Sequence, residues 1–316
     1  MRYFALVLQL MLVLPGALIL TGTMNKIHAR AEGRRGASLL QPWREIRKLF
    51  SKTVLEPRGT GPVFRFAPLM LFSSTVAVAL MIPLVSTNFL FSQDFDLFWV
   101  VGIFMLGTIA LALGALDTGT AFGGMGSSRE LMVVALLEPS ILMAIYALSI
   151  RANSSNIFAI VAATLSHTNQ ISSPASALSF AGLVIVVIAE SGRLPVDNPA
   201  THLELTMIHE AMVLEYCGYR LALVKWATYM RLLLLLGLVA NLFFPFGLAQ
   251  TDSGVRLVVG AITSLGKILL LGSILAIVEV PMAKLRLFRV PELLAGSFVL
   301  GLLAVTASYY IPTAIR

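Results

Sequence analysis

Long apolar stretches separated by short polar segments run along almost the whole chain of 316 residues. A helix needs about 20 mostly apolar residues to cross the hydrocarbon core of a bilayer. The pattern therefore predicts an all-α integral membrane protein, with about eight transmembrane helices and amphipathic helices in its cytoplasmic loops. We expect a single polytopic membrane domain over 1–316. The expected spans are 3–23, 64–88, 97–116, 131–151, 174–191, 226–248, 256–280 and 292–312.

The composition agrees with a chain whose solvent is lipid. Hydrophobic residues make up 58% of it and charged residues only 12%, and the mean hydropathy is +0.88. A soluble domain usually carries about 25% charged residues, so this chain has too little polar surface for a water-soluble globule. Its single cysteine, Cys217, excludes an intrachain disulfide and an iron–sulfur cluster held by four thiolates of this chain.

The basic residues are concentrated on one side of the predicted topology. The first loop, 24–65, holds ten of the 23 Lys and Arg residues, and the third, fifth and seventh loops add seven more. Loops rich in Lys and Arg stay in the cytoplasm, so we expect an even number of spans and both termini outside. The dense basic block after the first apolar stretch favours a retained first helix over a cleaved signal. The first loop carries Lys26, Arg30, Arg34, Arg35, Arg44, Arg47, Lys48, Lys52, Arg58 and Arg65.

Two other classes of protein fit the pattern less well. The net charge of +7 follows from loops on one side of a membrane, which argues against a nucleic-acid partner. No internal repeat is visible, although inverted repeats are common in secondary transporters. The sequence also contains no Walker loop, no Gly-x-Ser-x-Gly and no zinc signature.

An amphipathic helix is predicted inside the first loop. Pro42 suits a first helical position, after which Trp43, Ile46, Leu49 and Phe50 fall on one face. Two interpretations stay open: a lipid-facing anchor, or a helix that walls a cavity and docks a cytoplasmic partner. The candidate docking residues are Arg34, Arg35, Gln41, Trp43, Arg44, Arg47 and Lys48.

The fifth loop, 189–225, is acidic and interrupted by prolines. A helix is expected from about Thr201, on which Glu204 and Glu215 lie three turns apart and share a face. Carboxylates stacked near a membrane suit a proton path, because protonation neutralises each one where charge is costly. The alternative is a solvated loop. The candidate relay residues here are Glu190, Arg193, Asp197, Glu204, Glu210, Glu215 and Tyr216.

A metal site in this loop is not expected, because His202 and His209 are seven residues apart, about 10 Å along a helix. Ionisable residues inside the predicted spans are a second group of candidates. Glu138, Lys267 and Glu279 would be expensive to bury without a polar cavity or a partner. Either a role in ion coupling or a structural ion pair between helices explains them.

Several motifs resemble a known family. The segments 116–131 (LDTGTAFGGMGSSREL), 136–139 (LLEP) and 34–50 (RRGASLLQPWREIRKLF) look like the membrane anchor subunit of formate hydrogenlyase and hydrogenase-4, the component C type of group 4 membrane-bound NiFe hydrogenases. So does the pattern of Glu279 followed by 282–286 (MAKLR). More distantly, the chain is similar to the quinone-cavity subunit of complex I, the NADH dehydrogenase subunit 1 family.

The resemblance implies an eight-helix anchor subunit in a bacterial or archaeal cytoplasmic membrane. It implies hydrogenase-like large and small Fe–S subunits on the cytoplasmic side and antiporter-like membrane subunits alongside. Fe–S clusters and, in a hydrogenase, a NiFe centre would belong to those partners, and this chain would hold no cofactor. Residues matching the cavity motif are Glu190, Arg193, Pro195, Asp197, Glu204, Glu215 and Tyr216, and those matching intramembrane positions are Glu130, Glu138 and Lys267.

One departure separates the chain from complex I subunits. Their Glu-x-Glu pair after the Asp of this loop is replaced here by Ala200 and His202, which favours the hydrogenase-type branch. The leading hypothesis is therefore a non-catalytic membrane subunit of an oxidoreductase complex that couples electron transfer to proton or sodium translocation. The alternatives are a quinone-binding subunit of a complex I-like quinone reductase and, less favoured, a stand-alone secondary transporter.

Overall fold

The computed structural model describes residues 2–88, 95–166, 173–197, 207–249 and 253–310. Seven of its helices are long and apolar enough to cross a membrane, and α7 (Pro174–Glu190) is a shorter apolar helix of 17 residues, at the lower limit for a span. The prediction of an all-α protein with about eight spans is confirmed. The seven are α1 (Arg2–Ala31), α3 (Pro62–Met81), α4 (Leu97–Asp117), α5 (Ala121–Ala152), α9 (Gly218–Phe243), α10 (Gly254–Glu279) and α11 (Val290–Tyr310).

Within the described ranges, four short elements lie between the long helices. They are α2 (Gln41–Phe50), α6 (Ile157–Ser166), α8 (His209–Val213) and the 3₁₀ turn η2 (Leu287–Arg289). The predicted amphipathic helix of the first loop is confirmed as α2, whereas α6 had no counterpart among the expected elements.

Three helices extend beyond the spans that hydropathy indicated. α1 continues to Ala31, α5 begins ten residues before 131, and α9 begins at Gly218 rather than at 226. Hydropathy marks where a helix leaves the lipid, whereas a helix ends only where a cap or a breaker stops it. Arg129, Arg220 and Lys225, which the sequence placed in loops, consequently lie on helices.

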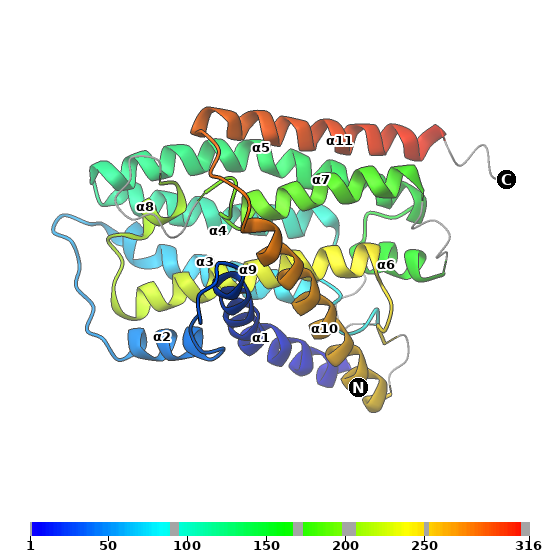
Figure 1. The fold of residues 1–316 in the computed structure, drawn as a ribbon, viewed down its shortest axis with the longest axis horizontal. Coiled ribbons are helices and arrows are strands. Elements are labelled where there is room, and N and C mark those ends of the chain that lie inside the picture. The colour runs from blue at the N-terminus through cyan, green and yellow to red at the C-terminus, as the bar shows by residue number, and fades with distance from the viewer. Residues whose placement is uncertain (1, 89–94, 167–172, 198–206, 250–252, 311–316) are drawn as a thin grey trace.

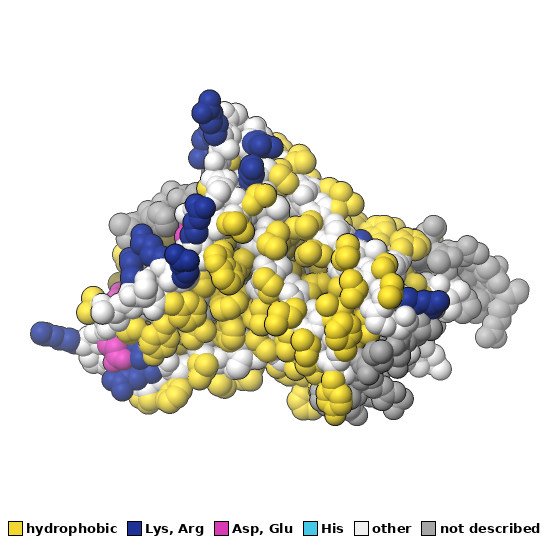
Figure 2. Space-filling view, turned by 90° about the horizontal axis from the view of Figure 1, so that it is seen from below, with side chains coloured by type: hydrophobic (Ala, Val, Ile, Leu, Met, Phe, Trp, Pro, Cys, Tyr) yellow, Lys and Arg dark blue, Asp and Glu magenta, His cyan; other side chains and the backbone are white. Residues whose placement is uncertain are grey.

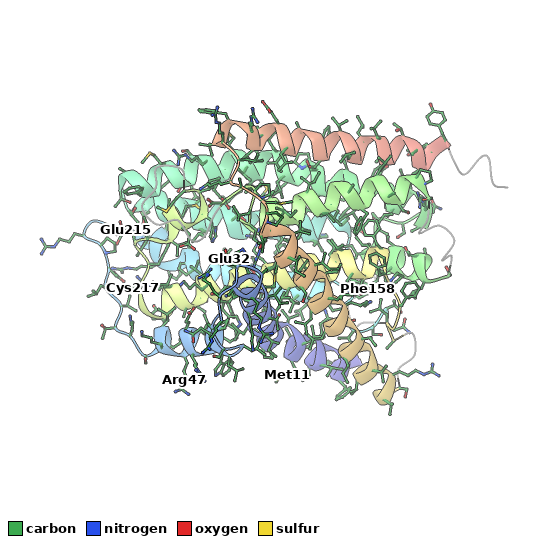
Figure 3. All side chains as sticks on the ribbon, viewed as in Figure 1. Met11, Glu32, Arg47, Phe158, Glu215 and Cys217 are labelled. Carbon is green, nitrogen blue, oxygen red and sulfur yellow. The ribbon has the colours of Figure 1, made fainter. Side chains whose placement is uncertain are left out.

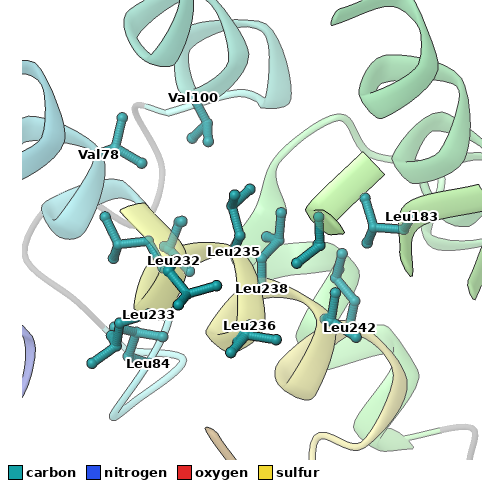
Figure 4. Packing of buried hydrophobic residues seen from close by; sticks show 14 of the residues in the cluster. Val78, Leu84, Val100, Leu183, Leu232, Leu233, Leu235, Leu236, Leu238 and Leu242 are labelled. Carbon is teal, nitrogen blue, oxygen red and sulfur yellow. The ribbon is translucent and has the colours of Figure 1, made fainter. Parts of the chain in front are cut away.

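The long helices form a bundle around α9 (Figure 1). α9 packs against α1, α3, α7 and α10, while α5 packs against α4, α7 and α11. A continuous run of leucines on α9 is buried at the centre, where it meets Val78, Leu84, Val100 and Leu183 (Figure 4). α1 and α10 lie obliquely across one side of the bundle (Figure 1).

The non-helical segment after α3 is held by side chains from other helices. Gln9 donates to the carbonyls of Ala79 and Ile82, and Asn241 donates to the carbonyl of Pro83 at 2.7 Å. Backbone groups inside a bilayer must be satisfied within the protein. These amides of α1 and α9 therefore satisfy carbonyls at and after the end of α3 that have no helical partner.

Charge and apolar surface are separated along the bundle. Lys and Arg side chains gather near the end that carries α2, and apolar side chains cover the surface beyond it (Figure 2). The first turn of α1 and the last turn of α11 lie at the end opposite α2 and α8 (Figure 1). The fold thus agrees with an even number of crossings.

Gly22 is one place where α1 and the segment leading to α2 touch. A β-carbon there would lie 2.0 Å from the carbonyl oxygen of Leu39. We expect Gly22→Ala to lower the stability of the solubilised protein by about 1–3 kcal/mol, because backbone must shift to admit the methyl group. Thermal unfolding in detergent measures this. The matched control is Gly296→Ala, which meets nothing within 4 Å; equal midpoints for the two variants would contradict the prediction.

Candidate functional site

Three ion pairs tie the segment after α7 to neighbouring elements. Glu190, the last residue of α7, pairs with Arg231 of α9. Arg193 Nη1 lies 3.0 Å from Glu279 Oε2 at the end of α10. Lys284 Nζ, in the loop after α10, donates to Asp197 Oδ1 at 2.9 Å. The segment from Glu190 to Asp197 is thereby fixed at one end of the bundle.

Asp197 and α5 together position α8. The Asp197 side chain is almost fully buried, and its Oδ2 accepts the backbone N–H groups of Ile208 and His209, each at 3.3 Å. From the other side, Arg129 Nη1 donates to the carbonyl of Met207 at 3.0 Å. A short helix of five residues is held here by side chains rather than by its own length.

His209 forms the contact between α8 and the carboxylates. Its Nδ1 lies 3.9 Å from Glu130 Oε1 on α5. Burial lowers the pKa of His209, but the interaction with the Glu130 carboxylate and the negative charge of Glu210 outweigh burial and raise the pKa above its ordinary value. The imidazole is therefore held toward its protonated form beside Glu130.

A cavity of about 240 Å³ opens between α1, the segment after α7 and α9. Two smaller cavities, of about 30 and about 10 Å³, follow it inward. Neighbouring cavities share lining residues: Asp197 and His209 line the first two, and Glu190 and Arg231 the second and third. Each of the two smaller cavities has room for one or two waters. Together the three cavities form a polar route from the open cavity into the bundle.

Glu138 lies at the inner end of this route. It lines the innermost cavity together with Thr108, Glu190 and Arg231. Its Oε1 is buried and has no hydrogen-bond partner in the described structure. On α5 it is two turns from Glu130, about 12 Å along the axis, so one helix carries an acid beside the middle cavity and another beside the last one.

The structure brings together Glu130, Glu138, Glu190, Arg193, Asp197, Glu210 and Glu279 around these cavities or through the ion pairs beside them. Lys267 lies apart. Its Nζ donates to Asn241 Oδ1 at 2.8 Å and to the carbonyl of Phe244 at 2.9 Å, where it caps the C-terminal end of α9.

The expected long helix of the fifth loop is wrong at its C-terminal end. α8 ends at Val213, so Glu215 does not lie on it and follows in a turn. The chain turns after Val213, where the Tyr216 N–H bonds to the Val213 carbonyl and Gly218 takes a left-handed φ of +59°, so the helix does not run on. Glu204 and His202 lie outside the described residues. Glu215 and Cys217 lie near the end of the bundle beyond α8 (Figure 3).

Tyr216 is buried against α3. Its ring stacks on Phe64 with the centroids 4.3 Å apart, and its hydroxyl donates to the Phe64 carbonyl at 3.3 Å. Burial raises the pKa of Tyr216 above its ordinary value, so the phenol stays protonated. The contact joins the segment before α9 to α3.

α2 presents a basic face outward. Ile46 is buried and Phe50 meets Trp226 of α9 edge-on at 6.5 Å, whereas Arg44, Arg47 and Lys48 are exposed. Figure 3 shows Arg47 pointing away from the bundle. The other candidate docking residues lie nearby: Trp43 is half exposed, Gln41 donates to Glu45 at 3.3 Å, Arg34 pairs with Glu32, and Arg35 is exposed.

Arg231 is the site residue that sequence reasoning missed. Its side chain is only 11% exposed and pairs with Glu190. Nη1 donates to Thr108 Oγ1 at 2.5 Å, and Nη2 donates to the Phe104 carbonyl at 3.1 Å. An arginine inside an apolar span implies a buried acidic partner, and that signal was available.

The fold and this cluster define a class: a multi-pass helical membrane protein with acidic and basic side chains buried in a connected series. Over residues 4–309 the chain matches the NADH dehydrogenase family, and it belongs to this family. Within the described residues, no group of three or more His, Cys, Asp or Glu is placed to hold a metal ion.

Two curated relatives confirm the resemblance. Hydrogenase-4 component C of Escherichia coli (strain K12) is 32% identical over 286 residues, covering 90% of this chain and 89% of the relative. Formate hydrogenlyase subunit 4 of the same organism is 28% identical, covering 94% and 95%. The fold is shared with a chain of the membrane-bound sulfane sulfur reductase, an archaeal respiratory membrane complex, at a TM-score of 0.79 and 18% identity, covering 97% of this chain and 99% of that one.

The His209–Glu130 pair predicts a pH dependence of stability. A histidine whose folded pKa is raised adds stability below its unfolded pKa, and this is lost as pH rises through the folded pKa. We expect the thermal midpoint of the wild type to fall more than that of Glu130→Gln between about pH 6 and about pH 8. Glu45→Gln on α2 is the matched control. Parallel pH profiles for the wild type and Glu130→Gln would contradict the pairing.

Proposed function

We propose that this chain is the membrane subunit of a multi-subunit, redox-driven ion-translocating complex of the hydrogenase or complex I type. The observation that carries the proposal is the series of three cavities from the open end of the bundle to Glu138. Carboxylates spaced along such a route can take up and release protons where a fixed charge would be costly. Its similarity to component C of hydrogenase-4 and subunit 4 of formate hydrogenlyase supports the assignment.

In this proposal the chain carries no catalytic centre. Electron transfer takes place on cytoplasmic hydrogenase-like large and small subunits, which hold the Fe–S clusters and, in hydrogenases, a NiFe centre. Antiporter-like membrane subunits lie alongside. The basic loops face the cytoplasm and both termini lie outside, as the distribution of Lys and Arg favours.

The relay would begin at the 240 Å³ cavity, where Glu210 and His209 meet the solvent. It would continue through Glu130 and the Glu190–Arg231 pair to Glu138. Two ion pairs fix the walls of the cavities: Arg193 with Glu279, and Asp197 with Lys284. A shift in the loop after α7 would therefore alter the spacing of the carboxylates. Glu204 and Glu215 remain predicted members of the entry region.

A quinone site is the second candidate function, favoured by the same cavity. It opens between α1 and the segment after α7, and Tyr229, His209 and Arg193 offer hydrogen-bond donors to a carbonyl headgroup. A quinone-competitive inhibitor that leaves turnover unchanged rules against this alternative.

Replacing Glu138 by Gln tests the relay. The amide keeps the shape of the side chain but cannot bind and release a proton, so we expect the complex to assemble and transfer electrons while ion translocation per turnover is lost. Inverted membrane vesicles with dyes for pH and membrane potential measure this. Glu292→Gln, at an exposed glutamate at the start of α11, is the control; unchanged translocation in Glu138→Gln would remove Glu138 from the path.

The basic face of α2 is expected to bind the cytoplasmic partners. In the double variant Arg47→Glu/Lys48→Glu, attraction becomes repulsion, so those subunits should dissociate at lower salt, with roughly 0.2–1 kcal/mol lost for each exposed pair. Affinity purification through a tag on this chain, followed by mass spectrometry over a salt series, measures the loss. Arg256→Glu at the opposite end should retain all subunits, and identical profiles for the two variants would refute docking at α2.

A further inference from the structure

An apolar groove of about 220 Å³ lies on the side of the bundle between α7 and α10, away from the polar route. The two helices approach each other where they end, at Glu190 and Glu279, and diverge toward the opposite end of the bundle (Figure 1). Leu236 and Val239 of α9 form the floor between them. Each described side chain that lines the groove is apolar, so the groove is a wedge without hydrogen-bonding side chains.

The groove is bounded at both ends and open at its side. At the narrow end, the ion pair of Arg193 and Glu279 joins the segment after α7 to the last turn of α10. At the wide end, the ring of Phe180 meets Phe243 of α9 edge-on, with the centroids 5.1 Å apart. Ile274, in the wall formed by α10, is 49% exposed. The open side therefore faces the bilayer.

The shape of the groove favours a flexible chain over a helix. A helix with its side chains is about 10 Å wide along its whole length, whereas a cube of 220 Å³ has an edge of about 6 Å and the groove narrows toward Arg193. An acyl chain can follow a tapering apolar wedge and needs no polar partner. Because lipid tails are as apolar as the lining, burial alone gains little, and selectivity must come from the headgroup.

The loop after α10 places two arginines beyond the narrow end. The N–H of Leu285 donates to the carbonyl of Pro195 at 2.8 Å, which fixes the loop against the segment after α7. Arg286 and Arg289 follow, both exposed, and Phe288 between them is 88% exposed. An exposed aromatic ring between basic residues is typical of a segment at the membrane surface, where arginines attract anionic lipids.

We propose that the groove between α7 and α10 binds an acyl chain of an anionic phospholipid, whose phosphate contacts Arg286 and Arg289. The bound chain covers the side of the Arg193–Glu279 pair that faces the bilayer. Since Arg193 also lines the 240 Å³ cavity, the lipid supports one wall of that cavity from outside. The site is separate from the relay and does not depend on it.

Photocrosslinking in the assembled complex tests this site. The complex is reconstituted in phosphatidylcholine nanodiscs with a trace of phosphatidylglycerol that carries a diazirine in one acyl chain, and mass spectrometry locates the adducts. We expect adducts on groove residues such as Val187 and Val278. An excess of unlabelled phosphatidylglycerol should displace them, whereas the same excess of phosphatidylcholine should not.

Two pairs of variants separate the headgroup from the chain. Arg286→Gln/Arg289→Gln should weaken the binding of the probe about 25-fold, because each basic residue beside an anionic lipid contributes about fivefold. The matched control is Lys52→Gln/Arg58→Gln, at two exposed basic residues of the first loop, which should leave the labelling of the groove unchanged.

Ile274→Trp fills the groove and should abolish the displaceable adducts. Ile262→Trp, on the same helix at a residue that is 65% exposed and does not line the groove, should keep them. Equal displacement by the two lipids, or equal labelling in either variant and its control, would overturn the proposal. Groove residues without adducts in the assembled complex would also overturn it, because a helix of another subunit would then cover the groove.

Discussion

A charge buried inside a bilayer must find its counter-charge within the protein, and in this fold the ion pair of Arg231 and Glu190 meets that requirement. The guanidinium also satisfies Thr108 and the Phe104 carbonyl on α4. One side chain of α9 therefore sets the positions of α4 and α7 around the central helix. Because Glu190 ends α7, the same pair determines where the next segment begins.

That segment can be non-helical only because it lines a cavity and its polar groups are paired. Arg193 is held by Glu279, and Asp197 by Lys284 and by the backbone of Ile208 and His209. These contacts reach α10, the loop after it and α8. The site thus forms because α7 is short and ends inside the bundle. Its residues come from elements that are far apart in the chain.

Hydropathy is a one-dimensional property, so the spans and the amphipathic α2 could be predicted from the sequence. The extents of α1, α5 and α9 could not, because the edge of the lipid is not the end of a helix. α8 was overestimated since the packing of Tyr216 on Phe64 of α3 turns the chain after Val213 and overrides local propensity. The pairing of Glu190 with Arg231, 41 residues away, depends on the rotation of two helices that only packing fixes.

In the proposed relay, the fold also constrains where a proton can go after Glu138. Between Arg231 and Asn241 the residues of α9 are buried and, with Gly237, wholly apolar, from Leu232 to Ala240. The ten helical steps from Arg231 to Asn241 rise about 15 Å, so this apolar section separates the acidic route from the polar contacts of Lys267 and Asn241 near the other end. A proton crossing along α9 would have to pass it without a polar partner. Transfer from Glu138 sideways to a neighbouring membrane subunit avoids that barrier, which suits the proposed coupling of electron transfer to ion channels in partner subunits.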